Sequence, residues 1–317
     1  MTVTDFTATH AEEARRIAMQ NYEAQRGFVP ALPPIDAVPD LVEFADNGMG
    51  VAAIDGGEML GFLCAYLPVD NVFGTTDVKG AWSPVHAHAA VEDGRGMIYK
   101  RMYQAAAEKW VRAGAVSHAI TLYAHDKTGL DSFFQYAFGL RFVDAIRMTD
   151  HLGERGPDVY RFAELGRKEA GKIAALRNLL IDHLGQSPCF LRYPHTSERD
   201  VLDRAVRENL RIFTAADADK IIGYIEITAS GENFVCDAPD MMNICGAYLL
   251  PEYHGKGIHT GLLSYLADKL KGEDYTRLGV DFESINPTAW GFWLKYFDAF
   301  THSIVRRIDE HALKGRI

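Results

Sequence analysis

Apolar and polar positions along the chain form a series of elements that occurs twice. In the first half, a helical pattern over residues 11–25 is followed by a hairpin pattern over residues 51–67. In the second half, a helical pattern over residues 167–184 is followed by a hairpin pattern over residues 211–228. Because the same elements recur in the same order, the sequence predicts a duplicated domain.

The pattern then continues alike in both halves. Each half is expected to add a strand, then a glycine-rich turn that opens a helix, and then a further strand. In the first half the strand, helix and further strand are expected at residues 85–91, 97–113 and 119–123. In the second half they are expected at residues 244–250, 258–270 and 278–282. A short helix and a closing strand complete each half. This order of strands and helices indicates an α/β fold, which some schemes class as α+β.

Three short motifs support the duplication and place the domain limits. They are Leu60-Gly61-Phe62-Leu63, which returns as Ile222-Gly223-Tyr224-Ile225; Asp93-Gly94-Arg95-Gly96, which returns as His254-Gly255-Lys256-Gly257; and Phe133-Phe134, which returns as Phe292-Trp293. A stretch rich in glycine and charge over residues 153–158 suggests the boundary. We therefore predict an N-terminal domain over residues 1–155 and a C-terminal domain over residues 156–317.

Composition narrows the class of protein. The formal net charge of −10 argues against nucleic acid as a partner and is compatible with a cationic amine as a substrate. No apolar run reaches the ~18 residues that a membrane-spanning helix needs, and no secretory signal is visible. The 4 cysteines are too scattered for a disulfide scaffold or a zinc site. We expect a cytoplasmic protein without a metal, and either a monomer or a homodimer.

The turn at residues 253–261 carries the clearest chemistry. It follows a strand and opens a helix, and the first turn of a helix presents unpaired N–H groups and partial positive charge to an anion. Gly255, Gly257 and Gly261 let the backbone approach such an anion closely. Neither the P-loop nor the Rossmann pattern fits this turn. The turn is therefore expected to hold a phosphate group of some other cofactor.

Residues 250–263 resemble the acetyl-CoA loop of the GCN5-related N-acetyltransferase (GNAT) superfamily, which reads R/Q-x-x-G-x-G/A. Residues 286–293 resemble the N-x-x-A-x-x-F-Y motif of the same superfamily. The resemblance covers essentially the whole chain as a tandem pair. It implies two GNAT-like domains, each with a mixed, mostly antiparallel central sheet flanked by helices.

The resemblance also implies a cosubstrate, acetyl-CoA or another acyl-CoA, and a set of residues that hold it. Backbone N–H groups from Gly255, Lys256, Gly257, Ile258, His259 and Thr260 would bind the pyrophosphate. Leu249 and Leu250 would pair their backbone with pantetheine, where the strand that carries them splays from its neighbour. Asn286 would hydrogen-bond the pantetheine arm or order the site.

Some positions depart from the superfamily pattern. His254 stands where Arg or Gln is usual, which alters one side-chain contact with the cofactor. His259 stands where Gly or Ala is usual and would crowd the phosphates unless it points away. Trp293 stands where many members carry the Tyr that protonates the leaving thiolate, and indole cannot serve as an acid at neutral pH.

The first half departs further from the pattern. Its turn has Asp93 in the Arg or Gln position and Ile98 in the final Gly or Ala position. Lys127 falls at the Asn position and Phe134 at the Tyr position. We therefore expect the C-terminal domain to bind acyl-CoA and to be catalytic, and the N-terminal domain to be degenerate.

Two residues are candidates for acid–base catalysis. Glu226, between two isoleucines of a strand, is either a base acting through water or a solvent-facing residue. Tyr296, one helical turn after Trp293, is either the missing acid or part of the core. His86 and His88 share one face of a strand, where a structural or pocket-lining role is favoured over metal binding.

The predicted reaction is transfer of an acetyl group from acetyl-CoA to a primary amine of a small molecule, by direct attack in a ternary complex. A protein or peptide amine and a longer acyl group stay open as alternatives. So does a pseudoenzyme that binds CoA without catalysis.

Overall fold

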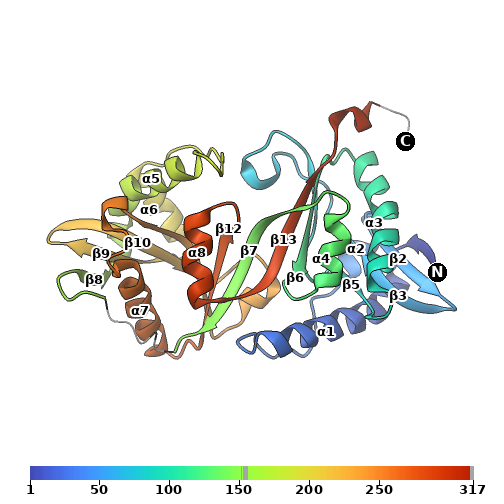
Figure 1. Ribbon diagram of the computed structural model, residues 1–317, viewed down its shortest axis with the longest axis horizontal. Coiled ribbons are helices and arrows are strands. Elements are labelled where there is room, and N and C mark those ends of the chain that lie inside the picture. Colours follow the sequence, from blue (N-terminus) through green and yellow to red (C-terminus); the bar gives the residue numbers. More distant parts are fainter. Residues whose placement is uncertain (151, 153–155, 315–317) are drawn as a thin grey trace. The chain divides into compact units, whose positions relative to one another are not determined.

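The computed structural model describes residues 1–150, 152 and 156–314. They form two compact units, which are treated separately (Figure 1). Unit 1 comprises Met1–Val143 and Ala299–Ile317, and unit 2 comprises Asp144–Asp298. These limits differ from the limits of 1–155 and 156–317 expected from the sequence, because unit 1 also includes the residues from Ala299 onward, which contain the last strand of the chain. Of the expected boundary segment, residues 153–155 lie outside the described residues.

Unit 1 is built around two groups of strands. Its helices are α1 (Ala11–Phe28), α2 (Val42–Ala45), α3 (Arg95–Arg112) and α4 (Lys127–Phe134). Its strands are β1 (Thr2–Asp5), β2 (Val51–Asp55), β3 (Glu58–Leu63), β4 (Gly80–Ser83), β5 (His88–Ala90), β6 (Ser117–Tyr123), part of β7 (Gly139–Met148) and β13 (Asp298–Arg307). The strands run in the orders β1-β2-β3-β5 and β4-β6-β13-β7. Pairing of β4 with β6 is parallel, and pairing of β13 with β6 is antiparallel.

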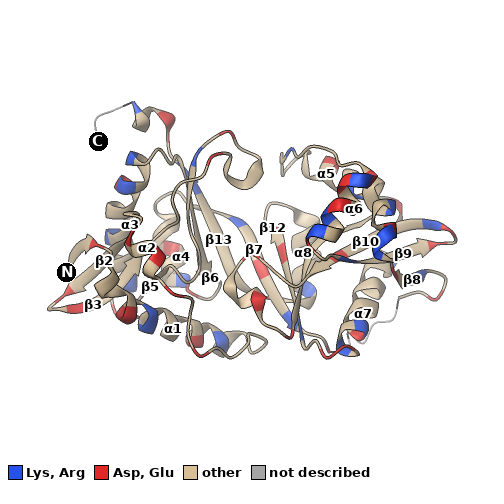
Figure 2. Ribbon diagram, turned by 180° about the vertical axis from the view of Figure 1, so that it is seen from behind, with Lys and Arg blue, Asp and Glu red and all other residues tan. Residues whose placement is uncertain are grey.

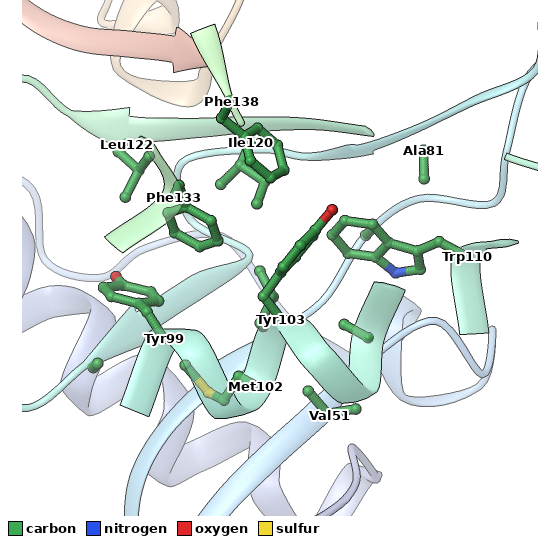
Figure 3. Close-up of a cluster of buried hydrophobic side chains, with 14 of the residues drawn as sticks. Val51, Ala81, Tyr99, Met102, Tyr103, Trp110, Ile120, Leu122, Phe133 and Phe138 are labelled. Atoms are coloured by element: carbon green, nitrogen blue, oxygen red, sulfur yellow. The ribbon is translucent and has the colours of Figure 1, made fainter. Parts of the chain in front are cut away.

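Helix α3 supplies the aromatic centre of the unit 1 core, shown in Figure 3. Apolar residues recur along it at helical spacing, so one face of the helix is buried. The ring of Tyr103 makes edge contacts with Trp110 and Phe133, at centroid distances of 6.1 and 5.8 Å. Its hydroxyl donates to Nδ1 of His118 at 3.0 Å, so this buried polar group is satisfied.

Unit 2 carries a single mixed sheet. Its helices are α5 (Ala174–Leu184), α6 (Glu198–Arg207), α7 (Ile258–Lys271) and α8 (Pro287–Tyr296). Its strands are part of β7, β8 (Arg161–Glu164), β9 (Arg211–Asp217), β10 (Lys220–Thr228), β11 (Met241–Leu249) and β12 (Arg277–Glu283). The order is β7-β12-β11-β10-β9-β8, in which β11–β12 is parallel and β8–β9, β9–β10 and β10–β11 are antiparallel. This mixed, mostly antiparallel sheet confirms the predicted fold class.

The two faces of the unit 2 sheet are covered by different helices. On β9, Phe213 packs against Tyr265 of α7, with centroids 6.2 Å apart. Glu226 of β10 contacts Arg177 of α5 and Arg204 of α6. Phe213 pairs with Ile225, and neighbouring strand residues point to opposite faces. Helix α7 therefore covers one face, and α5 and α6 cover the other.

Several elements differ from the sequence predictions, and three of the differences have a local cause or signal. The strand expected over residues 85–91 is shortened to β5 (His88–Ala90), because Pro84 begins a turn in which the Ala87 N–H donates to the Pro84 carbonyl at 2.8 Å. The helix expected over residues 167–184 begins as a 3-10 helix and becomes α-helical only at Ala174. Helix α6 was not predicted, although Ser197 caps it by accepting from the Asp200 N–H.

None of the helices within the described residues is long and apolar enough to cross a bilayer.

Candidate active site in unit 2

Strand β11 parts from β12 halfway along its length. Its first residues, Met241–Ile244, pair with β12. The next residue, Cys245, is a bulge against β10, because Ile227 pairs with Ile244 while Glu226 pairs with Gly246. From Cys245 to Tyr248 the strand is partly exposed instead of buried. One edge of β11 is thus left open toward β12 beyond the bulge.

The open edge presents backbone groups for hydrogen bonding. The Leu250 N–H donates to the Ile222 carbonyl of β10 at 3.0 Å, and the Leu250 carbonyl accepts from the Tyr253 N–H at 2.9 Å. Because antiparallel residues alternate between neighbours, Leu249 turns toward the open edge. Nε2 of His254 donates to the Leu249 carbonyl at 2.9 Å. Of the two residues expected to pair with pantetheine, Leu249 therefore has the suitable orientation.

The glycine-rich turn follows directly and ends at the first residue of α7. Gly255 and Gly257 have φ angles of 74° and 72°, which favour glycine. The Gly261 N–H donates to the Gly257 carbonyl at 2.9 Å, which is the first hydrogen bond of the helix. The N–H groups of Ile258, His259 and Thr260 precede it, so they have no acceptor within the helix. Together with the helix dipole, they make this turn suited to an anion.

The His259 side chain turns away from the turn and packs on α8. Its ring stacks on Phe292 at a centroid distance of 4.6 Å and meets Trp293 edge-on. Burial, and to a smaller extent the nearby His254, lower the pKa of His259 to about 4. His259 is therefore neutral at physiological pH. Its ring occupies space beside α8 and does not add charge to the anion site.

The motif at the start of α8 is held by its own capping. The Asn286 side-chain oxygen accepts from the N–H and the hydroxyl of Thr288, at 3.2 and 2.7 Å, and from Nε2 of His183 at 3.3 Å. A hydrogen bond from Asn286 to pantetheine would therefore come from its Nδ2. This binding role stays a prediction.

Tyr296 lies beside the first turn of α7. Its hydroxyl is 2.9 Å from the hydroxyl of Thr260, in the first turn of α7, and accepts from Nζ of Lys295 at 2.8 Å. Trp293 is only 5% exposed and packs against Phe297. The role of Tyr296 as the acid stays a prediction.

Glu226 is fully buried, so the solvent-facing interpretation was wrong. Its Oε2 accepts from Nη1 of Arg177 at 2.7 Å and from Nη1 of Arg204 at 3.0 Å. Its Oε1 accepts no hydrogen bond from the described part of the chain. Beside it, burial raises the pKa of the Cys245 thiol to about 12, so this thiol is not a nucleophile at neutral pH.

Comparison with known proteins agrees with this geometry. The family model of the acetyltransferase (GNAT) family matches residues 178–298, which contain the open edge of β11, the turn and the α8 motif. The solved structure of a GCN5-related N-acetyltransferase from Sphaerobacter thermophilus is similar over 96% of this chain and 95% of its own, with a TM-score of 0.54 and 12% identity.

The family-model match assigns residues 178–298 to the GNAT superfamily. A glucosamine N-acetyltransferase region of a fungal multi-domain GH3 β-N-acetylglucosaminidase is also similar in fold, with a TM-score of 0.52 and 11% identity, over 96% of this chain and 38% of that one. No curated protein matches the sequence. At these identities the solved structures show a common fold, and the GNAT family supports acyl transfer as the general activity.

The corresponding glycine-rich turn in unit 1 has a different hydrogen-bond pattern. Gly94, with a φ angle of 69°, immediately precedes α3. The N–H groups of Met97 and Ile98 both donate to its carbonyl, at 2.9 and 3.1 Å. Ile98 corresponds to His259, whose N–H precedes the first hydrogen bond of α7. The helix of unit 1 thus begins earlier in the motif and uses amides whose counterparts in unit 2 have no acceptor within the helix.

Arg95 occupies the end of the corresponding strand in unit 1. Its guanidinium donates to the carbonyls of Ala90 and Val91, at 3.0 and 3.3 Å, and to Asn21 at 3.0 Å. It also forms an ion pair with Asp126 at 3.4 Å. Arg95 therefore binds backbone carbonyls of this strand end and is itself paired with a carboxylate.

His88 closes the gap between strands in unit 1. Its Nε2 donates to the Thr121 carbonyl of β6 at 2.7 Å, and its Nδ1 accepts from the Tyr99 hydroxyl at 3.2 Å. His88 pairs with Leu63, and in unit 2 the corresponding pair is Ile225 with Ala247. A small residue thus replaces the imidazole at the open edge. No His86–His88 metal site is found within the described residues.

Proposed function

We propose that unit 2 transfers the acetyl group of acetyl-CoA to a primary amine of a small molecule, in a ternary complex. The observation that carries the proposal is the continuous path from the open edge of β11 to the free amides at the start of α7. The first part of this path suits the amide groups of pantetheine, and the second suits the pyrophosphate. Unit 1, where Arg95 and His88 occupy both parts, is proposed to be degenerate.

Specific groups of unit 2 would hold the cosubstrate. The N–H groups from Gly255 to Thr260 would bind the pyrophosphate, and Leu249 would pair with pantetheine. The thioester supplies an activated acetyl group, which the amine attacks at the carbonyl carbon. A backbone N–H near the bulge at Cys245 would stabilise the oxyanion. Trp293 cannot protonate the leaving thiolate.

The buried indole of Trp293 favours a second candidate function, CoA binding without transfer. A pseudoenzyme of this kind needs the same anion site but no acid or base. The two functions differ in whether free CoA thiol accumulates when an amine is present.

Acetyl-CoA is expected to raise the melting temperature of the protein. At a concentration 100 times Kd, the ligand stabilises the folded state by about 2.7 kcal/mol, which corresponds to a shift of about 5–10 °C. Differential scanning fluorimetry with acetyl-CoA, NAD and ATP measures this shift. Release of free thiol with a panel of amines then separates transfer from binding alone. An absent shift at millimolar acetyl-CoA would contradict both candidate functions.

A further inference from the structure

The acceptor side of the site can be compared between the two repeats. In unit 1 the last β4–β6 pair is Ser83 with Ile120, and in unit 2 the last β11–β12 pair is Ile244 with Val280. The next residues are therefore equivalent, so Asp281 corresponds to Thr121. The residues before the last pair correspond too, and Asn243 takes the place of Trp82.

In unit 1 these positions form a closed, uncharged hydrogen-bond chain. Nε1 of Trp82 donates to the Thr121 hydroxyl at 3.0 Å, and this hydroxyl lies 2.8 Å from that of Ser303 on β13. Ser303 pairs directly with Thr121. The polar side chains at these positions of unit 1 are thus satisfied by one another.

In unit 2 the same positions present oxygen acceptors. Asn243 is 4% exposed, and its Nδ2 donates to the Cys236 carbonyl at 2.9 Å. Its Oδ1 accepts no hydrogen bond within the described residues. That oxygen lies over Gly279, where a Cβ would be only 2.4 Å from it. A buried amide oxygen without a donor is costly, and a bound N–H group would satisfy it.

Acidic residues lie on the segments next to this amide oxygen. Asp281 follows Gly279 by two residues on β12, so it points to the same face as Asn243 and is partly exposed. Asp144 of β7 accepts from Nδ2 of Asn233 at 2.9 Å. Glu232 adjoins Gly231, which packs over Asn243.

We infer that Asp281, with Asn243 beside it, binds the ammonium group of the acceptor amine and removes its proton. This inference rests on the proposed function. Asp281 is the first residue of β12 beyond the pairing with β11, so it borders the open edge where the thioester is expected. Carboxylate and amide oxygens are the acceptors that an ammonium group with three donors requires.

The proton balance of the step is complete. One proton passes from the ammonium nitrogen to the Asp281 carboxylate and then to solvent. The free amine forms the new N–C bond at the carbonyl carbon, and the C–S bond breaks with its electron pair on sulfur. The second proton of the nitrogen neutralises the thiolate. The products are the amide and free CoA.

The environment of Asp281 suits this role. Desolvation first, then the charges of Glu232 and Asp144, raise the pKa of Asp281 to about 8. Glu283 on the same strand makes a smaller contribution to this shift, and the thiols of Cys236 and Cys245 interact with the carboxyl. A base with a pKa near the working pH combines a useful ionised fraction with a strong drive to take a proton.

Asp281→Asn is expected to lower kcat/KM for n-butylamine by about 100-fold or more, the usual contribution of a general base. For aniline, which is uncharged at neutral pH, the loss is expected to be much smaller. Thiol-release rates for both amines measure this split, with Kd for acetyl-CoA unchanged by calorimetry. The control is Asp203→Asn, which removes an exposed charge of α6 and should alter neither rate.

Stability gives an independent readout. A carboxyl whose pKa is raised on folding holds its proton more tightly in the folded state, so stability falls as pH rises from about 4 toward 8. Asp281→Asn removes this loss and is expected to raise the melting temperature at pH 8. A residue that serves only to support the fold would lower the melting temperature when replaced.

The outcomes separate the inference from the proposed function. Wild-type rates in Asp281→Asn, or equal losses for both amines, overturn the role of Asp281. If the protein releases no thiol with either amine, binding of 1,5-diaminopentane to the CoA complex is measured by calorimetric titration instead. Binding that Asp281→Asn weakens tenfold would then support the ammonium site while refuting transfer; no binding, or binding that Asp281→Asn leaves unchanged, would refute the site itself.

Discussion

Ala247→His is expected to reduce the affinity of the protein for acetyl-CoA by about 100-fold or more, a loss of ~2.8 kcal/mol of binding free energy. The substitution recreates in unit 2 what His88 does in unit 1, where the imidazole bridges β5 and β6 through the Thr121 carbonyl. Ala247 is partly exposed, so the larger side chain can be placed at the open edge without repacking the core. There it would occupy the path proposed for pantetheine.

Isothermal titration calorimetry with acetyl-CoA measures the effect. Tyr248→His is the matched control, because neighbouring residues of β11 point to opposite faces and Tyr248 lies opposite Tyr224 on the other one. It should bind acetyl-CoA nearly as the wild type does. A folded Ala247→His protein with wild-type affinity would show that the cosubstrate does not follow the open edge of β11.

The turn at the start of α7 could be predicted from the sequence because its signals are local. Glycines with positive φ and a following helix are encoded within a few residues, and Gly255 and Gly257 have the expected conformation. The open edge of β11 could be expected only through the resemblance to the GNAT superfamily. Its position depends on the bulge at Cys245, which no local pattern indicates.

Features that depend on which strands lie side by side could not be predicted from the sequence. His88 and Ala247 can be recognised as equivalent only when the registers of the β3–β5 and β10–β11 pairs are known. The environment of Asp281 includes a residue from a strand elsewhere in the chain. Asp144 belongs to β7, which lay in the predicted N-terminal domain but contributes its last residues to unit 2. Hydrophobic periodicity identifies a strand, yet it does not specify which strand lies beside it.

The role of Glu226 could likewise not be predicted, because the arginines that pair with its carboxylate lie on helices distant in sequence. Arg177 and Arg204 come from α5 and α6, whose charged residues are coloured in Figure 2. Their side chains are 21% and 20% exposed, while Glu226 is fully buried. Removing the buried partner of such a network leaves unpaired charge, which is far more costly than losing a surface ion pair.

We therefore expect Glu226→Gln to destabilise unit 2 by about 3–5 kcal/mol. A drop in melting temperature of roughly 6 °C or more should follow. Thermal and urea unfolding measure the change. Glu208→Gln is the matched control, because Glu208 also pairs with Arg204, at 2.8 Å, but is 38% exposed. Its effect should stay within about 1 kcal/mol.

The same variant tests the alternative role of Glu226 as a base acting through water. In that role its free Oε1 takes the proton, and Glu226→Gln would lose activity by about 100-fold or more at nearly unchanged stability. An anchoring role gives the opposite combination: lower stability, with kcat/KM of the folded fraction close to that of the wild type. Because Asp281→Asn is expected to lose rate while gaining stability, the two variants together assign the carboxylate that holds the helices and the one that takes the proton.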